Sequence, residues 1–267
     1  MAGKGLIRAG IGGWTFEPWR GVFYPKGLKH ADELNYASRR LNTLEINSTY
    51  YSSQKPETFA KWAASTPDGF VFSVKASRFA TNRRVLAEGE ESMRKFLTQG
   101  IVELGDRLGP ILWQFMATKK FDPDDFQSFL DLLPKTLQGL ALRHVVEVRH
   151  ASFAVPAFVE MCRERNVAIC VADHEVHPLI PDITADFVYS RLMTGSDDIE
   201  TAYPDSELDA WAERFTAYSK GQVPGDLPPV DRTGPAEGPR DVFAYVIHEG
   251  KVRAPAAAQA LLGRVNN

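Results

Sequence analysis

The sequence predicts an α/β fold in which eight parallel strands close into a single (β/α)8 barrel. Two observations lead to this prediction. Eight short apolar runs recur along the chain, and nearly every run is followed by a segment whose apolar residues have helical spacing. Alternation of this kind indicates parallel strands, and eight strands are the number that closes a TIM barrel. The 267 residues, 44% of them hydrophobic, are enough for one such domain over residues 1–267.

The strand-like runs are apolar, and most of them combine β-branched or aromatic residues. In chain order they cover residues 6–14, 43–49, 70–76, 110–115, 144–150, 167–173, 187–193 and 241–248. The segments predicted as helices cover residues 30–42, 56–64, 91–108, a segment from 122 to about 133, 156–166, 206–219 and 255–265. The connection after the sixth strand is short, so we expect only an abbreviated helix there.

Residues 222–240 are rich in proline, glycine and polar side chains, which predicts a loop that is free to move. The loop joins a helix to the next strand, so in a barrel it lies on the bottom face, away from the usual site of chemistry. The alternative fold is a doubly wound open sheet. That fold usually has a glycine-rich first turn, but the segment 10–13 is not GxGxxG and no GxxxxGK[ST] occurs. No nucleotide-cofactor motif is therefore present.

Charge and cysteine content narrow the class of protein further. The formal net charge of −3 excludes a bulk polycation that binds nucleic acid by charge alone. Cys162 and Cys170 form no CxxC pair, so we expect two small buried hydrophobes rather than a disulfide or zinc framework. The first ten residues lack the apolar region of a signal peptide, and no run is long enough to span a membrane. We expect a cytoplasmic protein with no membrane partner, and the oligomeric state stays open.

Polar side chains near the carboxyl ends of the strands define a candidate site, because in a barrel these ends meet at one mouth. Alternate residues of a strand share a face, so Glu45 and Asn47 should both point inward while their apolar neighbours meet the helices. The same rule pairs Ser73 with Lys75. The residues gathered at the mouth in this way are Glu45, Asn47, Lys75, Gln114, Glu147, Arg149, Asp173, Arg191 and His248.

Charges within apolar strands are costly unless they are paired, so this group indicates either a functional mouth or a structural ring of ion pairs. In the first functional hypothesis, Lys75, Arg149 and Arg191 bind a phosphate or carboxylate. Glu45, Glu147 and Asp173 are then the candidate acid–base residues. We expect a hydrolase, isomerase or lyase that acts on this small anionic molecule.

Two further hypotheses remain open. In one, a divalent metal is bound by Glu45, Glu147 and Asp173 with help from a histidine. The histidine candidates are His150, His174 and His248. The chain has only six histidines and no HxH or HExxH motif, so this signal is weak. In the other, the protein binds a ligand without turning it over.

An aromatic cluster precedes and follows the second strand. Trp14 and Tyr50 are the aromatic residues that we expect to contact a substrate. Other aromatic residues near them are Phe16, Trp19, Phe23, Tyr24 and Tyr51. Exposed aromatic rings beside a charged mouth suit stacking on a base or a sugar, which keeps a nucleic-acid phosphodiester enzyme as an alternative. The other interpretation is that these rings pack as a plug over the rim.

Several motifs together resemble a known family. They are Gly12-Gly-Trp14, Trp19-Arg-Gly-Val-Phe-Tyr-Pro25, Leu44-Glu-Ile-Asn-Ser-Thr-Tyr-Tyr51, Phe72-Ser-Val-Lys75, Leu108-Gly-Pro-Ile-Leu-Trp-Gln114, Val146-Glu-Val-Arg-His-Ala-Ser-Phe153, Tyr189-Ser-Arg191 and 254–260. In this order they resemble the YecE-like family, catalogued as domain of unknown function 72. The resemblance covers nearly the whole chain and implies a TIM barrel, but it supplies no function.

The chain departs from the pattern of that family at four places. Thr81-Asn82 stands where the family often has Thr-His, and Phe115-Met-Ala117 stands where Leu-Pro-Pro is common. Arg191-Leu-Met-Thr-Gly195 replaces Arg-x-His-Gly, and Val246-Ile-His-Glu249 replaces a segment with Phe-Asn-Asn. Two typical histidines are therefore missing, which weakens the metal hypothesis. The site residues that match the pattern are Glu45, Asn47, Lys75, Gln114, Glu147, Arg149 and Arg191.

Overall fold

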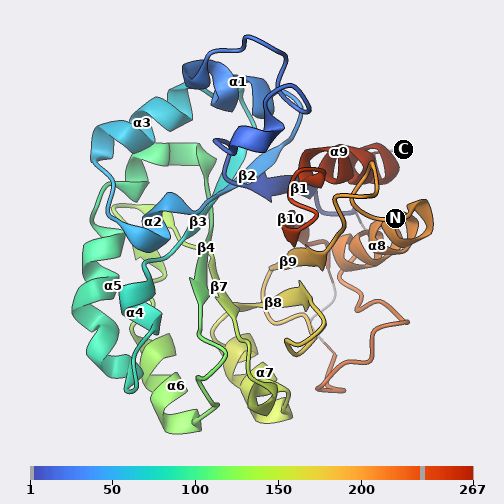
Figure 1. Cartoon of the computed structure of the whole chain (residues 1–267). Coiled ribbons are helices and arrows are strands. Elements are labelled where there is room, and N and C mark those ends of the chain that lie inside the picture. The colour runs from blue at the N-terminus through green and yellow to red at the C-terminus, as the bar shows by residue number, and fades with distance from the viewer. Residues whose placement is uncertain (1–2, 235–237, 267) are drawn as a thin grey trace.

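Eight parallel strands close into a barrel in the order β1-β10-β9-β8-β7-β4-β3-β2, which confirms the predicted fold (Figure 1). The structure is a computed structural model that describes residues 3–234 and 238–266. The barrel strands are β1 (Ile7–Gly12), β2 (Thr43–Ile46), β3 (Val71–Lys75), β4 (Leu108–Gln114), β7 (His144–Glu147), β8 (Ala168–Asp173), β9 (Phe187–Thr194) and β10 (Asp241–Glu249). The short strands β5 (Thr136–Leu137) and β6 (Leu140–Ala141) pair outside the barrel.

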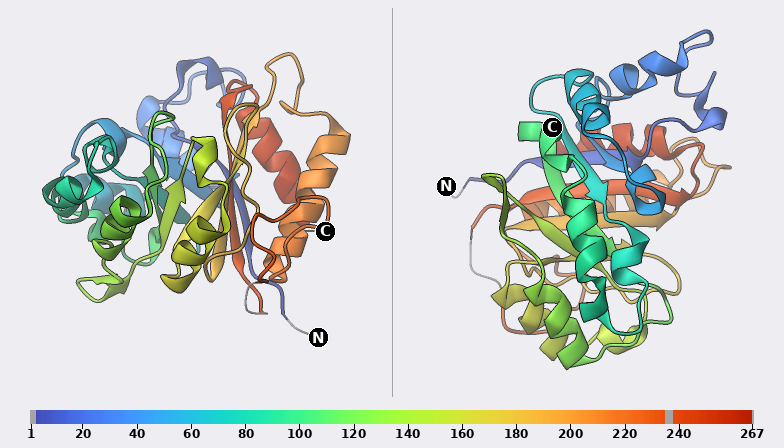
Figure 2. Two further views of the ribbon diagram at one scale, coloured as in Figure 1. Left: turned by 90° about the horizontal axis from the view of Figure 1, so that it is seen from below. Right: turned by 90° about the vertical axis from the view of Figure 1, so that its left-hand side faces the viewer.

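Helices flank the outside of the barrel (Figures 1 and 2). They are α1 (Glu33–Ala37), α2 (Ser48–Tyr51), α3 (Pro56–Ala64), α4 (Arg78–Thr81), α5 (Glu90–Leu97), α6 (Pro123–Asp131), α7 (Pro156–Glu164), α8 (Asp205–Ser219) and α9 (Ala254–Val265). The start of α6 follows from its sequence. The Asp122 carboxylate accepts hydrogen bonds from the backbone N–H groups of Asp124 and Asp125, and Pro123 occupies the first helical position.

Three predicted helices differ from the structure. The helix expected over 30–42 is reduced to α1, preceded by a 3-10 turn at His30–Asp32. The helix expected over 91–108 ends at Leu97, because Gly100 adopts a left-handed conformation with φ of 117° and a 3-10 segment follows. The abbreviated helix expected after the sixth strand is absent, and residues 174–186 run as a loop. Two prolines in that loop lack the N–H that a helix needs.

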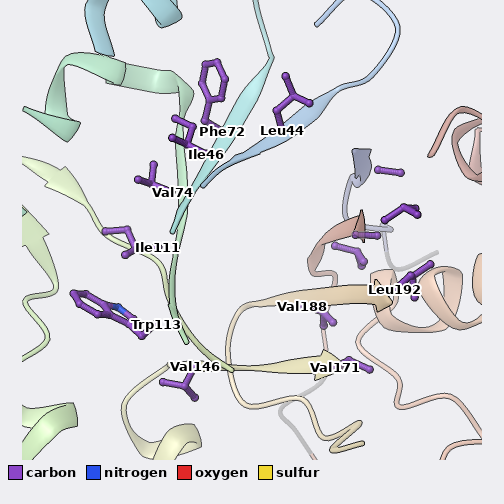
Figure 3. Packing of buried hydrophobic residues seen from close by; sticks show 14 of the residues in the cluster. Leu44, Ile46, Phe72, Val74, Ile111, Trp113, Val146, Val171, Val188 and Leu192 are labelled. Atoms are coloured by element: carbon purple, nitrogen blue, oxygen red, sulfur yellow. The ribbon is translucent and has the colours of Figure 1, made fainter. Parts of the chain in front are cut away.

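Alternation along the strands separates two apolar cores. Leu44, Ile46 and Phe72 lie on the face that the helices cover (Figure 3). The buried residues inside the barrel form a second cluster of Leu112, Val145, Ala168, Cys170, Ala172, Ala185, Phe187, Tyr189, Met193, Phe243, Tyr245 and Ile247. Both cysteines are free and buried, as predicted. The outward position of Leu44 and Ile46 leaves Glu45 pointing inward.

The described part of the 222–240 loop is held at the amino-terminal end of the strands. The Asp182 carboxylate accepts hydrogen bonds of 2.8 Å from the backbone N–H groups of Val230 and Asp231. The Asp231 carboxylate also pairs with Arg163 at 2.6 Å. These contacts anchor residues 230–231 within the segment that we predicted to be a flexible loop. Residues 235–237 of the predicted loop lie outside the described residues.

Candidate functional site

The barrel interior becomes more polar along its axis. Phe187, the first residue of β9, and Phe243, the third residue of β10, lie in the apolar interior. Two residues later on each strand, Tyr189 and Tyr245 add hydroxyl groups, and the Tyr245 hydroxyl lies 2.7 Å from Thr43 Oγ1. Charged side chains follow at the carboxyl ends of the strands. We call the residues Glu45, Lys75, Gln114, Glu147, Arg149 and Arg191 the charged ring.

Arg191 joins the two buried carboxylates of the charged ring. Its Nη2 donates to Glu45 Oε1 at 2.9 Å, and its Nη1 donates to Glu147 Oε2 at 2.5 Å. The second oxygen of Glu45 accepts a hydrogen bond of 2.5 Å from the Tyr189 hydroxyl. Both glutamates are fully buried, so these charges exist in the interior only because they neutralise one another.

Glu147 receives further donors on its other oxygen. Arg149 Nε and Gln114 Nε2 donate to Glu147 Oε1 at 2.7 and 2.9 Å, and Arg149 Nη2 lies 2.7 Å from the same oxygen. Burial by itself would raise the pKa of Glu147, but the guanidinium groups of Arg191 and Arg149 outweigh it and hold the pKa well below its ordinary value. Glu147 is therefore an ionised hydrogen-bond acceptor at neutral pH.

Lys75 belongs to the charged ring but stands outside its hydrogen bonds. Within residues 3–234 and 238–266, no side chain forms a hydrogen bond or ion pair with Lys75 Nζ, which lies 4.3 Å from the centre of the Tyr50 ring. Burial and the neighbouring Arg191 lower the pKa of Lys75 to about 8, against the partial opposition of Glu45 and Glu147. The ring contains three cationic side chains and two carboxylates, so Lys75 is the cation that remains without a carboxylate partner.

A cavity of about 530 Å³ opens above the charged ring at the carboxyl ends of the strands. Ring residues on its wall are Lys75, Gln114, Arg149 and Arg191, and its other lining residues include Trp19, Asn47, Tyr51, His248 and Lys251. A second cavity of about 460 Å³ is lined by Trp14, Phe16 and Trp62. The two cavities share Gly12, Asn47 and Lys251. Trp14 thus lies in the neighbouring cavity, and Tyr50 lies beneath the Lys75 ammonium group.

The expectation that Asp173 faces the mouth is wrong. Cys170 and Ala172 of β8 belong to the interior cluster, so Asp173 points to the outer face. There its carboxylate accepts a hydrogen bond of 2.7 Å from Thr194 Oγ1, and burial raises its pKa. Asp173 was chosen because it ends a strand. The alternation rule cannot decide its side where both faces of the strand are apolar.

The histidine candidates do not converge on a metal site. His248 is exposed and pairs with Glu249 at 3.1 Å, and His150 Nδ1 accepts a hydrogen bond from the Ser152 backbone. His174 stacks on His177 with a centroid distance of 3.6 Å. In the part of the chain that the structure describes, no three His, Cys, Asp or Glu side chains are placed to hold a metal ion. The residues at the mouth therefore do not fit the divalent metal considered above.

The aromatic residues of the first loop pack on one another as a plug. Trp19 and Tyr24 are each 1% exposed, and the Trp19 indole N–H donates to the Lys251 carbonyl at 2.8 Å. The Tyr24 hydroxyl donates to the Trp14 carbonyl at 2.7 Å, and the Trp14 ring meets Trp62 edge to face at 5.2 Å. Trp19 and Tyr24 are therefore buried in packing contacts and do not form an open stacking surface.

Sequence reasoning missed several residues of the site. Tyr189 shares the inward face with Arg191, so the same alternation would have found it. Lys251 follows the eighth strand on a turn, where no periodic signal exists. Trp19 was noted only as one of the aromatic cluster, and its contact with the mouth depends on how the first loop folds back onto the Lys251 turn.

Fold and site together define a TIM barrel with a cationic cavity at the carboxyl ends of its strands. Residues 8–267 match the family described as "Protein of unknown function DUF72". The chain belongs to this family, in agreement with the resemblance of its motifs. No helix within the described residues is both long and apolar enough to cross a membrane.

The chain is also similar to individual proteins. It is 30% identical over 165 residues to UPF0759 protein YecE of Escherichia coli strain K12, a match that covers 61% of this chain and 55% of that relative. The match thus spans about half the length of the curated relative. Two crystal structures of DUF72 family proteins share the fold. One, from Thermotoga maritima, has a TM-score of 0.70, 23% identity and coverage of 96% of this chain and 97% of that chain. The other, from Enterococcus faecalis, has a TM-score of 0.71, 16% identity and full coverage of both chains.

Proposed function

We propose that the mouth of the barrel binds a small anionic molecule that carries a phosphate or a carboxylate, and that the protein is an enzyme acting on it. The observation that carries the proposal is the Lys75 ammonium group, which faces a cavity of about 530 Å³ without a carboxylate partner among the described residues. A buried cation of this kind is stabilised when an anion enters and supplies the missing charge.

Arg149 supplies the second binding group. Its Nε and Nη2 atoms contact Glu147, whereas Nη1 forms no hydrogen bond with any residue that the structure describes. Its side chain is 27% exposed and lines the cavity. An anion oxygen can therefore accept hydrogen bonds from Arg149 and Lys75 together, while Glu147 keeps the guanidinium in a fixed orientation.

The role of the two glutamates follows from their contacts. Both oxygens of Glu45 and both oxygens of Glu147 already accept hydrogen bonds. A carboxylate held in this way is a poor proton acceptor, and the lowered pKa of Glu147 supports this conclusion. We therefore propose that Glu45 and Glu147 position the arginines rather than move protons. The buried, unpaired cysteines suit a reducing compartment, and we propose the cytoplasm.

Calorimetric titration with inorganic phosphate, glucose 6-phosphate and succinate tests the proposal. We expect at least one of these anions to bind, with affinity at least tenfold weaker in Lys75→Met and in Arg149→Met. The exposed helix residue Lys61 provides the matched control, because Lys61→Met changes the net charge equally but lies outside the mouth. Affinity should also fall as pH rises through about 8, where Lys75 loses its proton. Binding that is equal in Lys75→Met and the wild type would overturn the proposal.

A further inference from the structure

We propose that Lys75 is a nucleophile whose side-chain amine forms an imine with the carbonyl carbon of a small anionic aldehyde or ketone. The inference rests on the proposed function and deepens it, because it names the substrate class. That class is a carbonyl compound that also carries a phosphate or carboxylate. Three features of the mouth support the assignment.

The first feature is the isolation of the amine. Lys75 ends β3 and is 8% exposed, and its Nζ has no hydrogen-bond or ion-pair partner within the described residues. Two other lysines are paired with carboxylates: Lys119 pairs with Asp125, and Lys95 pairs with Glu91 at 2.7 Å. The nearby carboxylates Glu45 and Glu147 are already occupied by arginines, so neither fixes the proton on Lys75.

The second feature is the charge around the amine. Burial and the neighbouring Arg191 guanidinium disfavour the ammonium form and bring the pKa of Lys75 to about 8. A group with that pKa is neutral in about one molecule in ten at pH 7. An ordinary lysine is neutral in fewer than about one in a thousand. Desolvation beside a second cation is a known way of making a lysine amine reactive toward carbonyl compounds.

The third feature is what surrounds the product. A protonated imine carries the same single positive charge as the ammonium group it replaces. The face of the Tyr50 ring, 4.3 Å from Nζ, and the two glutamates of the charged ring can therefore stabilise it as they stabilise ammonium. Arg149 Nη1 is available to hold the carboxylate or phosphate of the same molecule, which orients the carbonyl toward Nζ.

The reaction is balanced without an oxidant or a reductant. The lone pair of neutral Nζ forms a C–N bond with the carbonyl carbon, and the carbonyl π electrons move to oxygen. A proton passes from nitrogen to oxygen through water in the open mouth, which gives the carbinolamine. The hydroxyl oxygen then takes up a second proton from water in the mouth, the nitrogen lone pair forms the C=N bond as the C–O bond breaks, and the oxygen leaves as water. Neutral amine, carbonyl compound and one proton thus yield the protonated imine and one water molecule.

Reductive trapping tests this inference. The full-length protein is incubated with pyruvate, glyoxylate, glycolaldehyde phosphate or neutral glycolaldehyde, reduced with sodium borohydride and analysed by intact-mass and peptide-mapping mass spectrometry. We expect one adduct per chain, located on Lys75, with higher yield for the anionic probes than for glycolaldehyde. Lys75→Arg should lose the adduct, because arginine lacks the nucleophilic amine. Lys61→Arg, an exposed lysine of α3 outside the mouth, should react as the wild type does.

Competition provides a test that needs no variant: inorganic phosphate should suppress the Lys75 adduct of the wild-type protein. Phosphate binding without any Lys75 adduct would overturn the imine inference and leave the proposed function standing. An adduct on Lys75 that forms equally with neutral glycolaldehyde and resists phosphate would support the nucleophile and overturn the anionic substrate class. Adducts spread over surface lysines at equal yield in Lys75→Arg would overturn the inference.

Discussion

Two nitrogens of the Arg149 guanidinium, Nε and Nη2, lie 2.7 Å from the same oxygen of Glu147, only two residues earlier in the chain. This contact divides the charged ring into two parts. Arg191 is buried between two carboxylates, and we expect its ion pairs to stabilise the folded protein. Arg149 is the more exposed of the two ion-paired arginines at the cavity, and its Nη1 is available to donate a hydrogen bond to a ligand.

Arg149→Met should lower the free energy of unfolding by only about 1–2 kcal/mol, because Glu147 keeps Arg191 and Gln114 as donors. Binding of phosphate should weaken much more, by at least tenfold. Urea denaturation and calorimetric titration of the same preparation measure the two effects. A variant that unfolds readily but binds phosphate normally when folded would assign Arg149 to the structure alone.

Arg191→Met should cost about 3–5 kcal/mol of stability, because it leaves two buried carboxylates without their shared cation. Urea denaturation of Arg191→Met and Arg149→Met compares the free energies of unfolding of the two variants. In the Glu45→Gln background the same substitution should cost less, since one buried charge has already been removed. A loss under about 1 kcal/mol would contradict a structural role for Arg191.

Lys75→Met should raise the free energy of unfolding by about 1–3 kcal/mol at pH 7, because a buried ammonium group without a carboxylate partner is removed. The pKa of Lys75 is about 8 in the folded protein and near 10.5 when unfolded. Between these two values the unfolded chain therefore binds more protons than the folded protein. The loss of stability caused by the buried ammonium group is full below pH 8 and becomes smaller as the pH rises toward 10.5. The gain in stability of Lys75→Met should shrink over that window. A lower melting temperature for Lys75→Met at pH 7 would disprove this account.

His144 should make stability depend on pH in the acid range. Burial lowers the pKa of His144 to about 4, and its ring accepts a hydrogen bond from the Trp113 indole and contacts the Pro134 carbonyl. Because the folded pKa lies below the unfolded value of about 6.5, the unfolded state binds more protons between them. The contribution of His144 to the free energy of unfolding is therefore full above pH 6.5 and is lost as the pH falls toward 4.

His144→Gln, which can retain one hydrogen bond, should flatten this dependence. The flattening should be partial, because the lowered pKa of His177, also about 4, acts in the same direction. Thermal unfolding of both proteins between pH 4 and 7 measures the slopes. Parallel slopes would show that His144 is not responsible.

The local pattern of apolar and polar residues was enough to predict the barrel and most residues of the charged ring. The pleat of a strand places alternate residues on opposite faces, so the apolar residues Leu44 and Ile46 left only one side for Glu45. The same pattern failed at Asp173, because β8 is apolar on both faces and has no polar residue that marks its inward side. The helix predicted over residues 91–108 ends early because Gly100 adopts a left-handed backbone conformation. The spacing of the apolar residues gives no sign of that conformation.

The sequence by itself determined eight strands, their order along the chain and most of the side chains that point into the mouth, because these depend on the spacing of neighbouring residues. Only the tertiary structure decided how those side chains divide their charges. Closure of the barrel brings Arg191 of β9 against Glu45 of β2 and Glu147 of β7, and it leaves Lys75 without a carboxylate partner among the described residues. Pairing of this kind depends on distances across the barrel, between residues up to 146 positions apart in the chain.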